Sequence, residues 1–90
     1  MIIVAGHLRV QPEDRDELLA RSLPSVETAR STEGCLDFAL APDPVDSGRV
    51  NVFERWVDRQ SLERFRADGP DGDLGDLIAA FEVGEYEVNS

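Results

Sequence analysis

The chain has 90 residues, of which 41% are hydrophobic, and its 19 acidic and 9 basic residues give a formal net charge of −10. This length and apolar content predict one globular domain over residues 1–90 and exclude a disordered chain. The acidic balance disfavours nucleic acid and anionic membranes as partners, because both are bound through basic patches.

The first predicted element is a strand over residues 2–10, in which apolar residues occur on both faces. One face carries Ile2, Val4, Gly6, Leu8 and Val10, and the other carries Ile3, Ala5, His7 and Arg9. Apolar residues on both faces are typical of a central strand that is covered on two sides.

A helix is predicted to follow, because residues 11–14 place a proline and two acids in a first turn, where both are favoured. The helical spacing of apolar residues continues from Leu18 to Ala29. Pro24 lies within this run and has no backbone N–H to donate, so we expect a kink or a short break there. Gly34 is expected to end the helix.

A β-hairpin is predicted next, from two apolar-alternating runs, residues 34–38 and 51–56, that flank a linker rich in Pro and Asp. In the second run Glu54 and Trp56 are two residues apart, so both point to one face, while Arg55 points to the other. A carboxylate beside an indole suggests the wall of a pocket. The competing interpretation makes Trp56 a core anchor and Glu54 a solvated charge at the rim.

The last part of the chain is predicted to contain a second helix and a final strand. The helix begins at residues 58–61, breaks in the acidic segment 68–76, and resumes with the helical spacing of residues 74–81. Residues 82–88 form the strand. Segment 68–76 is either a plain connector or a loop over a pocket mouth; it does not match a calcium loop, because Gly75 takes a ligand position.

The order β-α-β-β-α-β predicts an α+β, ferredoxin-like split β-α-β fold with an antiparallel sheet. Two helices cover one face of such a sheet and leave the other face without a cover. We expect several apolar residues on this open face, drawn from Ile2, Val4, Leu8, Leu36, Phe38, Leu40, Val50 and Val52. A second copy of the chain is therefore predicted to pack on the open face and form a homodimer.

Cysteine usage and the first residues restrict the chemistry and the location of the protein. Cys35 is the only cysteine, which excludes an internal disulfide and a cysteine-based metal site, and we expect no bound metal. No basic segment precedes the short apolar stretch at the start of the sequence, and no stretch approaches the length of a membrane span. These features predict a cytoplasmic protein.

Three segments carry a resemblance to a known family: Ala5-Gly6-His7, residues 33–38 with their Gly-Cys-Leu turn, and residues 51–56 with their Glu-x-Trp end. With these segments the chain resembles the antibiotic biosynthesis monooxygenase family over nearly its whole length. The resemblance implies a dimeric α+β barrel. Some members oxygenate aromatic polyketides or quinols without metal or flavin, and others degrade haem bound through a histidine of the following helix. This chain has Phe65-Arg66 in that helix, so we expect no haem. It also has no dinucleotide-binding motif, so we expect no flavin or other cofactor.

The resemblance further implies a cofactor-independent monooxygenase that oxidises a small aromatic substrate, a quinol, phenol or anthrone-like compound, with O₂. His7, the only histidine, is the expected catalytic base, since an imidazole exchanges protons near neutral pH. Glu54 is the second expected catalytic residue, in the role of orienting the imidazole or a bridging water. Trp56, Phe38 and Phe65 are expected to bind the substrate.

Two other functions remain open at this point. One is a non-catalytic dimeric module that binds a small ligand, and the other is an isomerase or decarboxylase that uses the same base without O₂. The single residues also have structural interpretations. His7 then bonds to a neighbouring strand, and Trp56 fills the core.

Overall fold

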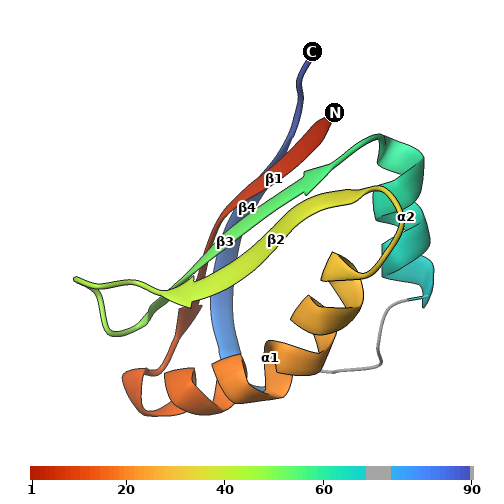
Figure 1. Cartoon of the computed structure of the whole chain (residues 1–90). Coiled ribbons are helices and arrows are strands. Elements are labelled where there is room, and N and C mark those ends of the chain that lie inside the picture. The colour runs from red at the N-terminus through yellow and green to blue at the C-terminus, as the bar shows by residue number, and fades with distance from the viewer. Residues whose placement is uncertain (69–73, 90) are drawn as a thin grey trace.

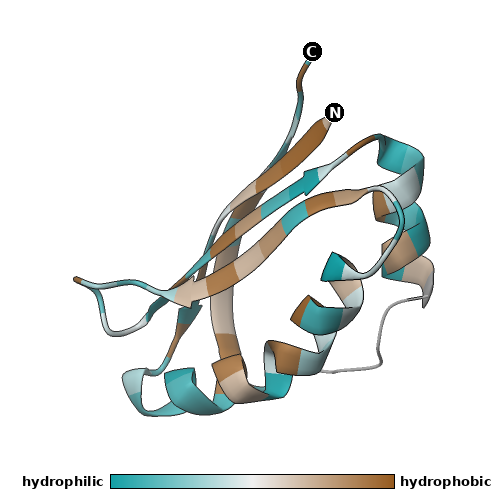
Figure 2. Cartoon of the chain, in the orientation of Figure 1, coloured by the Kyte–Doolittle hydropathy of each residue, from teal (hydrophilic) through white to brown (hydrophobic). Residues whose placement is uncertain are grey.

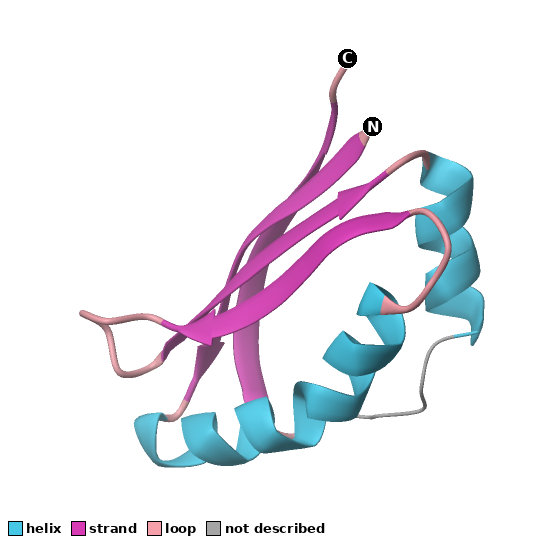
Figure 3. Cartoon of the chain, in the orientation of Figure 1, coloured by secondary structure: helices cyan, strands magenta, loops and turns pink. Residues whose placement is uncertain are grey.

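A computed structural model gives the fold of residues 1–68 and 74–89, which are the residues described below. The elements are β1 (Ile2–Val10), a 3-10 turn (Pro12–Asp14), α1 (Arg15–Arg30), β2 (Cys35–Pro42), β3 (Arg49–Trp56), α2 (Arg59–Asp68) and β4 (Ile78–Glu87). They form one antiparallel sheet in the order β2-β3-β1-β4, with both helices on the same face (Figure 1, Figure 3). The predicted α+β, ferredoxin-like fold is confirmed.

Helix α1 runs without a break through Pro24. Figure 1 shows that its axis nevertheless changes direction between the first and the last turns, as the missing backbone donor predicts. The hydroxyl of Ser22 donates to the carbonyl of Leu18 at 2.7 Å, a type of bond that also bends helices. At the start of α2, Asp58 Oδ1 accepts a hydrogen bond from the backbone N–H of Ser61 at 2.8 Å and caps the helix where the sequence predicts its start.

The predicted helical continuation over residues 74–81 is wrong. Strand β4 begins at Ile78 and pairs with β1 through Leu8↔Phe81 and Val10↔Ile78. The spacing of apolar residues fits a helix, but the free edge of β1 offers backbone partners that a helix would leave unused, and this long-range pairing prevails. Most of the acidic segment 68–76, residues 69–73, lies outside the described residues.

The core lies between the helices and one face of the sheet. Its main cluster consists of Ile2, Val4, Ala29, Phe38, Trp56 and Leu62, and a second cluster consists of Val10, Leu18 and Val50. Figure 2 shows the corresponding hydrophobic stretches on the strands, while the first turns of α1 are mostly hydrophilic. No helix within residues 1–68 and 74–89 is long and apolar enough to cross a membrane.

The apolar residues expected on the open face lie, with one exception, on the helix-covered face. Ile2, Val4, Phe38, Val50 and Val52 are buried there, and Leu8 and Leu40 pack against the same clusters. Leu36, the exception, sits where the register of β2 shifts and is 51% exposed. Alternation divides each strand into two faces, but only packing decides which of them meets the helices.

The open face has a different apolar set. Ala5 lies between Phe53 and Gly84 in the register of the sheet, and Ile3 lies beside Tyr86. The Phe53 and Tyr86 side chains are 38% and 56% exposed. An apolar face without a cover therefore exists, although it is made of residues other than those predicted.

Candidate functional site

Glu54 and Trp56 lie at the end of β3 and point to the helix-covered face. The indole Nε1–H of Trp56 donates a hydrogen bond to Glu54 Oε1 at 2.9 Å. Trp56 is completely buried, and Glu54 is half-buried. The prediction that they share one face is confirmed, and Trp56 is also the core anchor of the competing interpretation.

The position of Glu54 changes its acidity. Burial raises the pKa of the Glu54 carboxyl, while the hydrogen bond from Trp56 and the positive charge of Arg66 offset part of the rise. A carboxylate with a raised pKa is a stronger base than an exposed one. The side chain is therefore suited to accept a proton from a bound molecule.

Three aromatic side chains form a cluster around this pair. The Phe65 ring, on α2, lies 5.2 Å from the Trp56 ring between centroids and is tilted by 32°. The Phe38 ring, on β2, meets Phe65 edge-on at 5.7 Å. The structure thus brings together all three residues that the sequence assigns to substrate binding, together with Glu54.

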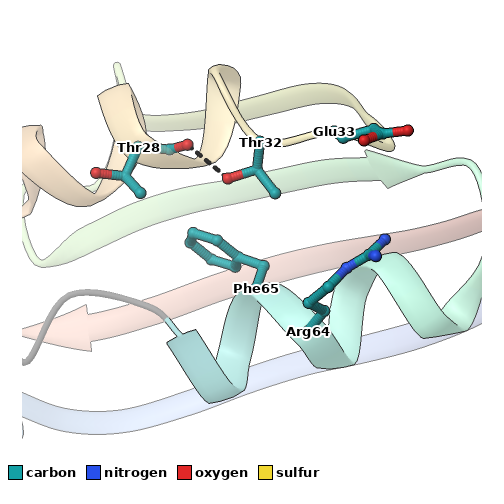
Figure 4. A pocket seen from close by; sticks show the side chains of 5 residues that line it. All are labelled: Thr28, Thr32, Glu33, Arg64 and Phe65. Carbon is teal, nitrogen blue, oxygen red and sulfur yellow. Dashed lines mark hydrogen bonds between the residues drawn. The ribbon is translucent and has the colours of Figure 1, made fainter.

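A cavity of about 320 Å³ adjoins the cluster between the end of α1 and α2 (Figure 4). It is lined by Thr28, Thr32, Glu33, Arg64 and Phe65. Only Phe65 was predicted to be a site residue. The other four were missed because Thr28 lies on α1, Thr32 and Glu33 lie in the turn after it, and Arg64 lies on α2. Tertiary packing alone brings these segments together, and no local motif links them. The four-residue spacing of Thr28, on α1, and Thr32, just after it, was the one available signal.

His7 lies on the open face, away from Glu54 and Trp56. The register opposes His7 to Asn51 on one side and to Glu82 on the other, whereas Glu54 is opposite Val4. The His7 Nε2 atom is 3.4 Å from Glu82 Oε2. The expectation that Glu54 orients the His7 imidazole is therefore wrong within one chain. The observed contact with Glu82 crosses to the neighbouring strand, as the structural interpretation of His7 expects.

Within the part of the chain that the structure describes, no group of three or more His, Cys, Asp or Glu side chains is placed to hold a metal ion. The sole thiol, Cys35, is half-buried, and burial raises its pKa. A thiol with a raised pKa is a poor nucleophile at neutral pH. Glu54 and the residues around the cavity are therefore the best candidates for a chemical role.

Comparison with known proteins identifies the family of this chain. A crystal structure from Deinococcus radiodurans, named a "putative antibiotic biosynthesis monooxygenase", is similar with a TM-score of 0.86 and 21% identity over 100% of this chain and 94% of that one. A protein with the same kind of name from Chloroflexus aurantiacus has 30% identity and a TM-score of 0.73, covering 99% and 94% of the two chains.

Among curated relatives, the uncharacterised protein sll1783 of Synechocystis is 32% identical over 62 residues, which are 69% of this chain and 42% of the relative. The match therefore spans less than half of that relative's length. The family model of the antibiotic biosynthesis monooxygenases matches residues 1–69, a range that contains β1 to β3, α1 and all of the site residues above. The chain therefore belongs to the antibiotic biosynthesis monooxygenase family.

Proposed function

We propose that the protein is a cofactor-independent monooxygenase that oxidises a small aromatic substrate, of the quinol, phenol or anthrone class, with O₂. Family membership supports this reaction class. The observation that carries the proposal is the half-buried Glu54 carboxylate, which is held by Trp56 and lies beside an aromatic cluster that reaches a cavity. Such surroundings exclude water from a reactive anion.

In the proposed reaction Glu54 removes a proton from a hydroxyl group or an activated carbon of the substrate. The resulting anion donates an electron to O₂, and the two radicals combine. One oxygen atom stays in the product and the other leaves as water, so an anthrone CH₂ and O₂ give a carbonyl and H₂O. A substrate in the cavity meets Phe65 before Trp56, so the reaction requires the Phe65 ring to swing aside.

Glu54→Gln should lower O₂ consumption with an active quinol or anthrone by roughly 100-fold, as loss of a general base does. An oxygen electrode and a panel of such substrates measure the rate. The amide keeps an oxygen that can accept the Trp56 hydrogen bond. His7→Gln is the control on the open face and should leave the rate essentially unchanged. A large loss for His7→Gln, with Glu54→Gln fully active, would assign the base to His7.

Stability measurements distinguish this loss of activity from misfolding. Because burial raises the folded-state pKa of Glu54, its contribution to stability is present below the unfolded-state pKa and is lost as the pH rises through the folded-state value. Glutamine does not ionise, so Glu54→Gln removes the destabilisation that comes from the buried charge at higher pH. The variant should therefore be at least as stable as the wild type at neutral pH while it is nearly inactive.

One observation favours the alternative of a non-catalytic ligand-binding module. Glu54 does not line the cavity, and Trp56 has no exposed surface in this conformation. A module of this kind would bind aromatic ligands but consume no O₂ with any member of the panel. The oxygen-electrode experiment therefore separates the two functions.

We infer that the protein acts as a homodimer joined through the open face of the sheet. Support comes from the exposed Phe53 and Tyr86 side chains and from the small Ala5 and Gly84 beside them. A chain of this size gains stability by covering such a face.

Phe53→Glu should convert the dimer to a monomer at micromolar concentration, because it places an unpaired charge at the centre of the interface. Light scattering on a size-exclusion column should give twice the chain mass for the wild type and the chain mass for the variant. Val45→Glu adds the same charge at the hairpin tip, where Val45 is 92% exposed, and should remain a dimer. A monomeric wild type would refute the inferred assembly.

A further inference from the structure

The cavity between α1 and α2 has an unusual lining for a chain with so many acids. Its walls offer a guanidinium from Arg64, a carboxylate from Glu33, two threonine hydroxyls and the Phe65 ring. Figure 4 shows Thr28 and Thr32 on one side and Arg64 and Phe65 on the other, with the Phe65 ring on the side of Thr28 and Thr32 and the Arg64 guanidinium on the side of Glu33. Polar groups of different kinds thus converge on one aromatic surface.

Within residues 1–67 and 74–89 no carboxylate forms an ion pair with Arg64, although the Asp58 carboxylate attracts it at longer range. Its one hydrogen bond there runs from Nη2 to the Ser61 hydroxyl at a long 3.4 Å. Ion pairs are formed instead by Arg9, Arg21, Arg49, Arg59 and Arg66. A guanidinium that forms no ion pair with these residues, in a chain with 19 acids, can bind an anionic group by its paired N–H donors.

The remaining walls define the rest of the ligand. The Thr32 hydroxyl donates to the Thr28 carbonyl at 2.7 Å, so its oxygen is left as an acceptor. The Thr28 hydroxyl has no partner in the described part of the chain and can donate to an anion. Phe65 offers a ring for stacking. A volume of about 320 Å³ is near the lower end of ligand pockets and suits one or two fused rings.

From this arrangement we propose that the cavity binds a small aromatic acid of one or two rings, with its carboxylate on Arg64 and its ring against Phe65. Glu33 repels a second negative charge and so favours a monoanion. The inference that such an acid is also the substrate rests on the proposed monooxygenase function. The binding site itself does not.

Isothermal titration of 2-naphthoate and the uncharged 2-naphthamide tests the site without any turnover. The wild type should bind the acid more tightly than the amide. Arg64→Gln should weaken binding of the acid by about tenfold, the usual effect of losing a charge-assisted hydrogen bond, and leave the amide unchanged. Arg9→Gln removes the same charge from β1, where Arg9 pairs with Asp46 and does not line the cavity, and should behave as the wild type.

Glu33→Gln should change the affinity for 2-naphthoate in the opposite direction to Arg64→Gln. Removing a like charge from the wall should tighten binding of 2-naphthoate by roughly two- to fivefold, the range expected for partly screened charges a few ångströms apart. The amide should again be unaffected. Equal affinity of the acid for the wild type and Arg64→Gln, or tighter binding of the amide than of the acid, would overturn the proposal.

Oxygen uptake with 2,5-dihydroxybenzoate and its methyl ester separates this inference from the proposed function. Binding of 2-naphthoate that depends on Arg64, without O₂ uptake from any substrate, would support the site and refute the monooxygenase. Equal turnover of acid and ester, unaffected by Arg64→Gln, would retain the monooxygenase and overturn the aromatic acid as its substrate class. The acid oxidised faster than the ester, with a loss of that preference in Arg64→Gln, would support both.

Discussion

Trp56→Ala should lower the free energy of unfolding by about 3–5 kcal/mol, the cost of replacing a large buried aromatic side chain with a methyl group. Trp56 is fully buried in the main cluster, with Ile2 and Leu62, and its ring packs against Phe65. The substitution also removes the indole donor from the half-buried Glu54, which adds the cost of an unpaired acceptor. In a small domain such a loss is a large part of the total stability.

Urea unfolding followed by far-UV circular dichroism measures this loss, because the variant has no tryptophan to report by fluorescence. Protein concentration must be fixed for all variants, since a dimer's stability depends on it. Phe81→Ala removes another aromatic ring, but that ring is 69% exposed, so its effect should be small. Trp56→Phe keeps most of the volume and should lie between the two. Equal losses for Trp56→Ala and Phe81→Ala would contradict this account of the core.

Alternation along single strands predicted the elements at the centre of the sheet correctly. The first strand has the predicted bounds, and Glu54 and Trp56 share a face, because both results depend only on the two-residue period of a strand. The alternation of apolar residues within one strand does not specify its register with the neighbouring strands. The location of His7 relative to Glu54 depends on register, and the identity of the open face depends on which face the helices pack against. Both were predicted wrongly.

The residues of the candidate site were likewise predicted only in part. Phe38, Trp56 and Phe65 were identified from the sequence through the family resemblance, and the structure places them in one cluster. Thr28 and Arg64 were not identified, because they are more than thirty residues apart in the sequence and only the tertiary fold brings α1 and α2 together at the cavity. Whether His7 or Glu54 is the base stays a prediction.

The second large effect concerns the close contact between β1 and β4 at Gly6. Gly6 has a φ of +155°, and a Cβ added there would lie 2.0 Å from the backbone oxygen of Glu82 and 2.7 Å from the Cα of Val83. Both obstacles belong to the backbone, so no side-chain rotation relieves them. Gly6→Ala should therefore lower the free energy of unfolding by about 3 kcal/mol, at the upper end of the range for local backbone strain.

Gly84→Ala is the matched control for Gly6→Ala on the same pair of strands. A Cβ at Gly84 would meet the Tyr86 hydroxyl at 2.5 Å, the end of a side chain that can rotate away, so its cost should be well below that of Gly6→Ala. Trp56 fluorescence during urea unfolding measures both variants, and equal costs would show that the backbone contact at Gly6 is not limiting.

The position of β4 also connects Gly6 to the candidate site. Glu85, on β4, accepts hydrogen-bonded ion pairs from Arg59 at 2.8 Å and from Arg66 at 3.0 Å, and both arginines belong to α2. Helix α2 also carries Arg64 and Phe65, which line the cavity. A displacement of β4 away from β1 therefore moves the anchor of α2, so folded Gly6→Ala should bind 2-naphthoate more weakly than Gly84→Ala in the same titration. Unchanged affinity in Gly6→Ala, together with the expected loss of stability, would show that the cavity is independent of how closely β4 packs on β1.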